Sequence, residues 1–432
     1  MRRYFCVIIL CLCFCATKVS AQQTVTVDAL ELARVAIFTG NYDAAREVLD
    51  VLLKNDPSDV EANFLMAELA VAQGDLDSAL SRFTSLLIDH PDLVRARLDY
   101  AAVLFRAKQD DRAEYNFRLT LAAELPDAAR ANVMQYLHLI QARRRYQVSA
   151  AASIAPDTNI NNGISANEIN LFGLPFVPDQ KLKTKSGTGV MFSVAGEYRY
   201  PITGTMSWRT NAMIWGTDYL GSGAFNDNIF RAASGPQWLS GSWGISALGV
   251  YTQRWYGSSP FYHGAGVGLE AAYSGFSRWR LEGSVENLEL KSHSENFMDG
   301  NYITLNFYPN YYFSATSFLR PIIGYLRQDV SDPTYSNSGY RAGLGFHQEY
   351  SRGISADFQG EAFLNFYNSP NPSFGTTRHD QTFRALASVY KRDWIIFAFN
   401  PVLTVIHTRN KSNQDLYSYS RTQFQIGFTK QY

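Results

Sequence analysis

The feature that most constrains this chain is a long series of segments in which apolar and polar residues alternate. In YITLNFYPNYYF, residues 302–313, Ile303, Leu305 and Phe307 share one face, while Thr304 and Asn306 share the other. Side chains along a strand point to opposite faces with period two, so this pattern predicts strands that are apolar on one side only. Fourteen such segments begin near residues 146, 187, 204, 226, 242, 261, 277, 300, 317, 338, 353, 379, 393 and 416.

The connections between these segments alternate in length. Tight links are expected around residues 201–203, 240–241, 275–276, 314–316, 351–353 and 392, and longer ones over 156–186, 220–225, 257–260, 292–299, 331–337, 368–378 and 411–415. An even number of antiparallel strands with short turns at one end and long loops at the other is typical of an outer-membrane β-barrel. We therefore predict a 14-stranded transmembrane barrel over residues 146–432.

The first residues predict export. MRRYFCVIILCLCFCATKVSA has two arginines, an apolar stretch and small residues at its end, which is the pattern of a secretory signal peptide over residues 1–21. All four cysteines lie within it, at positions 6, 11, 13 and 15. No later run of about 20 apolar residues occurs, and only helices and closed barrels satisfy every backbone group in lipid. A barrel is the spanning structure that remains.

Residues 22–145 predict a different fold. Gly40 and Gly74 are 34 residues apart, as are Ala33 and Ala67, and this is the tetratricopeptide period. A third, degenerate unit has Lys108 at the glycine position. We expect a periplasmic solenoid of paired helices, closed by a helix over about 127–145, ahead of the barrel. All seven tryptophans fall in the barrel part, between residues 208 and 394.

Two sets of residues are candidates for function. The repeat positions predict a concave face that serves as a groove for a polypeptide cargo or, equally, is ordinary helix packing: Arg34, Glu61, Phe64, Glu68, Arg95, Leu98 and Phe105. The strand alternation places charges of both signs toward the lumen, where they form a wet, salt-bridged wall or take a specific role: Glu197, Arg199, Arg209, Glu282, Glu286, Glu361 and Arg384. Gly264, Gly266 and Gly268 clear one strand face, either for neighbouring side chains or for a passing substrate.

The sequence offers no catalytic arrangement. It contains no HExxH, GxSxG or phosphate-loop motif, and its seven histidines are scattered. His379 and Asp380 adjoin a long loop, but neighbouring strand residues point to opposite faces. The formal net charge is zero, without a basic block for nucleic acid. We expect no enzyme, no cofactor and no metal.

Both ends of the barrel segment are informative. The closing FQIGFTKQY, residues 424–432, should place Phe424, Ile426 and Phe428 toward lipid, and with its terminal aromatic it resembles the signal read by the barrel assembly machinery. At the other end, QARRRYQVSA joins helix to strand without a Gly/Ser spacer, which predicts a rigid junction. We expect the cluster Arg143–Arg145 to contact lipid head groups or acidic turns of the barrel, while any one of these arginines is expected to complement the negative end of the helix dipole.

A leader, a short repeat array and a C-terminal 14-stranded barrel together resemble the surface lipoprotein assembly modulator family. APDTNIN, residues 155–161, is similar to a recurring segment of that family, matched at Pro156, Asp157, Thr158, Asn159 and Asn161. The resemblance covers residues 22–432. It implies an outer-membrane protein of a Gram-negative bacterium that moves a lipoprotein, or a soluble partner protein, to the cell surface. For the matched residues, a turn is the plain explanation.

Two other classes of function are open at this point. Exopolysaccharide exporters also join tetratricopeptides to a barrel, but usually with longer helical arrays. A surface adhesion module would use the barrel only to display its loops. The partners we expect are the cargo protein, outer-membrane lipid and the assembly machinery, with a monomeric barrel.

Overall fold

The computed structural model describes residues 19–294, 296–394, 396 and 399–429, with side chains from residue 29 onward. The predicted leader lies outside the described residues except for its last three. The chain divides into two compact units, Met1–Gln109 and Asp110–Tyr432. The second unit thus begins well before the first barrel strand, and it contains the last two helices of the chain.

The first unit is a stack of helices. They are α1 (Val19–Phe38), α2 (Tyr42–Asn55), α3 (Val60–Gln73), α4 (Leu76–Asp89) and α5 (Val94–Arg106). Asp59 and Asp75 cap α3 and α4, since their side chains accept hydrogen bonds from Ala62 and Ser78 backbone N–H groups. None of the described helices is long and apolar enough to span a membrane.

The 34-residue period holds in the backbone as well as in the sequence. Gly40 and Gly74 both have φ +79°, and Lys108, one period later, has φ +58°. The left-handed turn between paired helices is therefore kept even where the glycine is lost, although a positive φ has a higher conformational free energy for Lys than for Gly. Small residues let the helices approach each other, because Ala33 and Ala67 are completely buried.

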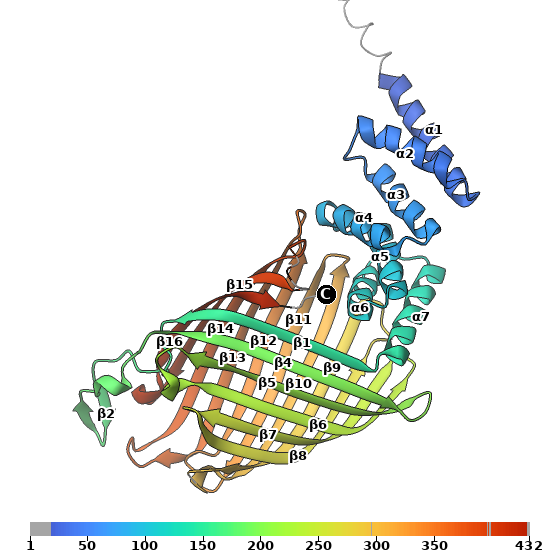
Figure 1. Cartoon of the computed structure of the whole chain (residues 1–432). Coiled ribbons are helices and arrows are strands. Elements are labelled where there is room, and N and C mark those ends of the chain that lie inside the picture. The colour runs from blue at the N-terminus through green and yellow to red at the C-terminus, as the bar shows by residue number, and fades with distance from the viewer. Residues whose placement is uncertain (1–18, 295, 395, 397–398, 430–432) are drawn as a thin grey trace, which may run out of the picture. The chain divides into compact units, whose positions relative to one another are not determined.

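The second unit starts with α6 (Asp110–Thr120) and α7 (Asp127–Arg143) and continues into a closed barrel of fourteen antiparallel strands (Figure 1). The strands follow chain order, and the last one pairs with the first, so the sheet has no free edge. This confirms the predicted fold class. The barrel strands are β1 (Tyr146–Asp157), β4 (Gly187–Pro201), β5 (Met206–Tyr219), β6 (Asp227–Ser240), β7 (Trp243–Tyr256), β8 (Ser259–Tyr273), β9 (Trp279–Ser292), β10 (Gly300–Ser314), β11 (Ser317–Val330), β12 (Asn337–Glu349), β13 (Ile354–Asn371), β14 (Thr376–Lys391), β15 (Asn400–Ser412) and β16 (Tyr419–Thr429).

The two ends of the barrel differ. At the helix end, where β1 follows α7, five of the six connections are turns of two to five residues, and the sixth covers residues 392–399. At the opposite loop end, the first connection carries the small hairpin of β2 (Ile169–Leu171) and β3 (Leu174–Phe176), and the described 3-10 helices lie in the loops of that end. These helices are η1 (Gln180–Leu182), η2 (Gly223–Phe225), η3 (Asn296–Met298) and η4 (Asp415–Tyr417).

Three predicted connections differ from the structure. The long link expected over 368–378 is only residues 372–375, because β13 extends to Asn371 and β14 begins at Thr376. The link expected over 257–260 is only Gly257–Ser258, whose positive φ angles, 58° and 67°, are those of a type I′ hairpin turn. The strand expected near 393 begins at Asn400, whose amide donates to the carbonyls of Lys391, Arg392 and Trp394 and ties the start of β15 to the turn at residues 392–393.

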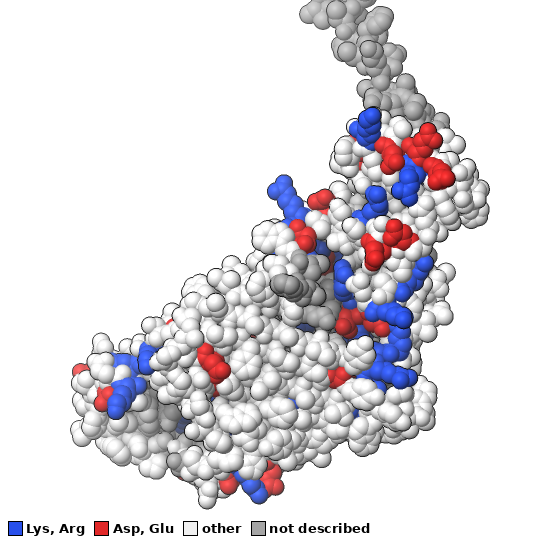
Figure 2. All heavy atoms as spheres, viewed as in Figure 1, with Lys and Arg blue, Asp and Glu red and all other residues white. Residues whose placement is uncertain are grey.

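The outer wall of the barrel is apolar. Phe424, Ile426 and Phe428 are exposed on it, as predicted for the closing strand, and Leu305 and Phe358 are exposed on strands farther round the barrel. Figure 2 shows few charged side chains on the visible face of the wall. Tryptophans at the helix end add an aromatic belt of the kind found at a membrane interface: Trp208, Trp238, Trp243 and Trp279.

The alternate glycines of β8 make room for neighbouring side chains. Gly264, Gly266 and Gly268 share the lumen face, and a Cβ added at Gly264 would overlap the Leu290 side chain, while one at Gly268 would touch Val250. Residues of the strands on either side therefore close over β8. The result is an apolar cluster in the lumen wall: Ala233, Leu248, Val250, Leu288 and Leu290, with Tyr262 and Tyr302 packed against it.

This packing predicts that Gly266→Ala destabilises the barrel. A Cβ there would overlap the Asn287 carbonyl oxygen of the adjacent strand, and overpacking of this kind costs about 1–3 kcal/mol. The matched control is Gly196→Ala, on β4, where a Cβ would meet open space. The measurement is the temperature at which the folded, faster-migrating form is lost on gels. Equal midpoints for the two variants would contradict this account of the glycine strand.

Candidate functional site

The predicted groove residues of the first unit lie on α1, α3 and α5. Arg34 of α1 forms an ion pair with Glu61 of α3, and Arg95 of α5 pairs with Glu68 of α3 at 3.0 Å. Each pair joins residues 27 positions apart. Arg34 and Glu68 occupy the same repeat position, and so do Glu61 and Arg95. The sign of the charge at both positions reverses from one repeat to the next, so both ion pairs are attractive.

An aromatic ring lies beside these ion pairs. Phe64 is buried on α3 and packs edge-on against Phe83, while the Arg95 guanidinium lies 4.7 Å from its ring centroid. The remaining predicted residues, Leu98 and Phe105, are half-buried on α5. Direct contacts therefore join five of the seven candidates in two groups on the first helices of the repeats. Arg34 contacts Glu61, and Arg95 contacts both Glu68 and Phe64.

Sequence reasoning missed Asp99, which lies one helical turn after Arg95 on the same face of α5. Burial raises the pKa of the Asp99 carboxyl to about 6, and the Glu68 charge adds to this effect while Arg95 opposes it. The i, i+4 spacing from Arg95 was the available signal.

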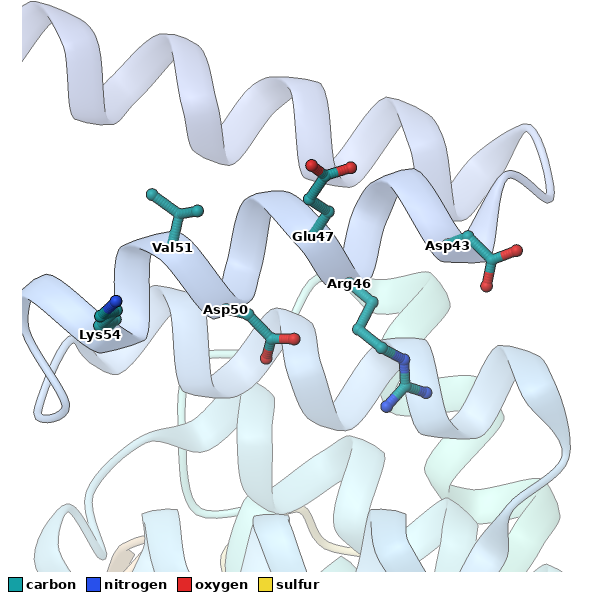
Figure 3. A pocket seen from close by; sticks show the side chains of 6 residues that line it. All are labelled: Asp43, Arg46, Glu47, Asp50, Val51 and Lys54. Carbon is teal, nitrogen blue, oxygen red and sulfur yellow. The ribbon is translucent and has the colours of Figure 1, made fainter.

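A second surface of this unit is only a solvated helix face. A shallow hollow is lined by six residues that all project from α2 (Figure 3): Asp43, Arg46, Glu47, Asp50, Val51 and Lys54. No second helix contributes a lining residue, and the charges are of both signs. We assign it no function.

The strand register places all seven predicted lumen residues on the face opposite the apolar outer wall. Glu197 forms ion pairs with Arg199 and Arg209, and Arg209 also pairs with Glu270 across the lumen wall. Arg384 stands opposite Glu361 in the register. The other pairs repeat this pattern along the wall: Arg231 with Glu286, Arg280 with Glu282, and Arg341 with Glu361. Outside the apolar cluster on β6, β7 and β9, the wall is thus polar, with its charges largely neutralised in place.

The segment 155–161 closes the barrel where β1 meets β16. The completely buried Asp157 side chain receives hydrogen bonds from Arg421 of β16, at 2.6 and 2.9 Å, from the Tyr219 hydroxyl and from Gln423. Its second carboxyl oxygen accepts from the Asn159 backbone N–H.

The asparagines of the same segment continue this network. The buried Asn159 amide donates to the carbonyls of Gly163 and Ser420, and Asn161 donates to the Lys183 carbonyl. Turn formation accounts for part of the motif, but its larger role is to join the first strand, the last strand and the first loop.

The helix end of the lumen holds a site that the sequence did not reveal. Here Glu114 and Tyr115 of α6 meet the barrel wall. The Tyr115 hydroxyl donates to Glu349 at 2.7 Å and lies 3.1 Å from the His347 Nε2 atom, both on β12. Glu114 lies 3.5 Å from the Arg280 guanidinium on β9. Helix α6 therefore spans the wall segment from β9 to β12.

Further arginines surround Glu114 from the helical side. Arg118 of α6 and Arg144, just after α7, both form ion pairs with it. Burial alone would raise the pKa of the Glu114 carboxyl, but the three guanidinium groups around it outweigh burial and lower that pKa to about 2.

The arginine cluster at the junction follows from the same arrangement. Arg143 binds Asp110 of α6, and Arg144 binds Asp111 as well as Glu114. The hypothesis that the cluster contacts lipid head groups is therefore wrong for these two arginines, which hold α6 against the end of α7. In the described part of the chain, His, Cys, Asp and Glu form no group of three suited to a metal ion.

A family model described as Surface lipoprotein assembly modifier matches residues 146–432, and tetratricopeptide models match residues 30–79 and 70–135. The chain belongs to the surface lipoprotein assembly modifier family. The match starts at the first residue of β1 and includes every barrel strand, so the resemblance inferred from the sequence is confirmed. With its closed sheet and apolar wall, this family member is an outer-membrane barrel protein.

Relatives are similar over most of their length. The surface lipoprotein assembly modifier of Moraxella catarrhalis is 23% identical over 91% of this chain and 78% of its own. Surface lipoprotein assembly modifier 1 of Neisseria meningitidis is 22% identical over 91% and 81%. The hemophilin secretion modulator of Acinetobacter baumannii is 22% identical over 83% and 76%.

Solved structures are more distant. A bacterial polysaccharide outer membrane secretin is 16% identical, covering 65% of this chain and 98% of its own, with a TM-score of 0.34. A Pseudomonas aeruginosa FadL homologue is 8% identical, covering 74% and 93%, with a TM-score of 0.36.

The charges around Glu114 predict a defined pH dependence for the docking of α6. Because the folded-state pKa lies below the ordinary value of 4.5, the carboxylate stabilises the docked helix above that pH, and its contribution is lost as the pH falls toward about 2. Glu114→Gln should lower the protection of α6 amides from hydrogen exchange at neutral pH by about 3 kcal/mol. Between pH 4.5 and about 2, the difference from the unaltered protein should shrink.

The matched control is Glu124→Gln, at an exposed carboxylate in the link after α6. It should leave the protection of α6 and its pH profile unchanged. A Glu114→Gln protein whose protection follows pH as the unaltered protein does would contradict the assigned role.

Proposed function

We propose that this protein is an outer-membrane translocator that delivers a specific lipoprotein, or a soluble partner protein, to the cell surface. The observation that carries the proposal is the family match over the whole barrel, together with relatives aligned over 91% of the chain. The names of the relatives refer to the assembly of surface lipoproteins and to the secretion of hemophilin. These names describe delivery of a protein rather than catalysis, so we propose no enzymatic activity.

In this proposal the barrel lumen is the path. Its wall is lined by arginine–carboxylate pairs such as Arg231–Glu286, which satisfy one another within the wall. A polypeptide would therefore meet a largely polar wall of low net charge, with few unpaired charges to bind it. Transport needs no cofactor or metal on this account.

We propose that the repeat unit lies in the periplasm and that the loop end of the barrel faces outside. The asymmetry between short turns at the helix end and longer loops at the other end supports this orientation. On this view the barrel is a monomer, inserted in outer-membrane lipid by the barrel assembly machinery, and the repeat face with Arg95, Phe64 and Glu68 engages the cargo or a periplasmic factor.

The experiment that tests the function is deletion of the gene, followed by surface labelling of candidate partner proteins. We expect at least one lipoprotein or secreted protein to be made at normal levels but to be absent from the surface. Complementation with the full chain should restore it. If every candidate is displayed normally in the deletion strain, the proposal fails.

The repeat face yields a sharper prediction. Arg95→Ala removes the Glu68 ion pair and the contact with the Phe64 ring, both at an exposed side chain, so the fold should lose less than about 1 kcal/mol. Cargo display should nevertheless fall several-fold at equal barrel abundance. The control is Arg46→Ala on α2, where the arginine also binds a residue 27 positions along, Gln73. Equal display by the two variants would remove this face from the transport path.

A further inference from the structure

Helix α6 belongs to two parts of the molecule at once. In sequence it is the second helix of the third repeat, since Ala113 continues the 34-residue series of Ala45 and Ala79. In the structure it belongs to the compact unit of the barrel, whose boundary falls between Gln109 and Asp110. It is therefore the element through which the repeats can act on the barrel.

The contacts of α6 lie at the helix end of the lumen. His347, Glu349 and Arg280 all occupy the lumen face of their strands in the register. The His347 ring also stacks on Phe318 of β11, between the strands that α6 touches. Figure 1 shows α6 beside the barrel end near β9, β10 and β11. Side chains of α6 thus occupy part of the mouth of the lumen.

The charged groups in this contact, and His347, each have a second partner on their own side. Glu114 keeps Arg118 and Arg144 on the helices if it leaves the barrel wall. In the wall, Arg280 keeps Glu282, Glu349 keeps Arg392 at 3.0 Å, and His347 keeps Asp357 at 2.7 Å. Breaking a buried pair is costly mainly because it leaves a charge without compensation. Here release would leave each of these charged groups with a partner, so that cost is avoided.

We propose that α6 is a latch on the inner mouth of the barrel, closed by Tyr115 and Glu114 and released when the repeats bind a partner. The proposal rests on the proposed function, because it supplies the step that opens the path for cargo. A permanent structural joint would bury charges whose partners lie only across the contact. The duplicated partners of this contact are those expected of an element that docks and undocks.

The test is ion conductance of the purified full-length protein in a planar lipid bilayer with KCl and no cargo. Tyr115→Phe combined with Arg280→Gln removes the polar contacts between α6 and the wall and leaves Glu114 paired on the helices. The time-averaged conductance should rise about tenfold, the effect of losing one charge-assisted hydrogen bond. The control, Glu124→Gln, changes an exposed carboxylate in the link after α6 and should conduct as the unaltered protein does. Unchanged conductance in the double variant would overturn the latch.

A second variant guards against a failure to fold. Tyr115→Cys with His347→Cys, whose rings lie 6.5 Å apart, can be bridged by a reducible bis-thiol linker, since the natural cysteines all fall within residues 6–15. The bridged protein should stay closed until a reductant is added. Full conductance, or full cargo display, with the bridge intact would overturn the latch. The conductance experiment needs no cargo, so it tests the latch independently of the proposed function. If the variants conduct as expected but deletion of the gene leaves every surface protein in place, only the proposed function is refuted.

Discussion

The structure depends on the pairing of every backbone N–H and C=O group inside a lipid layer. A sheet meets this requirement only if its last strand returns to its first, so the pairing of β16 with β1 decides whether the barrel exists. The buried Asp157 binds Arg421 across this seam. A segment that first suggested a turn therefore contributes to the closure itself, and it ties the first loop to the same point through Asn159.

Charge is handled differently in the three regions of the molecule. On the repeat face, exposed pairs such as Arg95–Glu68 add little stability and remain available to a partner. In the lumen wall, arginines and carboxylates neutralise one another within the sheet. Where α6 meets the wall, Glu114 has partners on both sides, so the same chemistry allows attachment and release. The lumen wall and helix α6 therefore differ in where the partners of each charged group lie, rather than in the number of ion pairs.

Much of the fold was predictable because its physics is periodic. Alternation of period two located the strands and their lipid faces, and a 34-residue period located the repeats, even at Lys108, where the glycine is missing. The hairpin turn at Gly257–Ser258 was not predicted, because the pattern of hydrophobic residues does not distinguish a two-residue turn from a short loop. The Asp157 network and the docking of Tyr115 on Glu349 join residues 264 and 234 positions apart, so no local pattern reports them.

The claim on which the account rests is that a protein passes through the lumen of this barrel. Ser284 and Val285 are neighbours on β9, and the register directs Ser284 into the lumen and Val285 to the outer wall. With a photo-crosslinking amino acid at either position in cells that export the partner, the account predicts adducts with that partner at 284 and none at 285. Adducts at 285 alone, or equally at both positions, would contradict it.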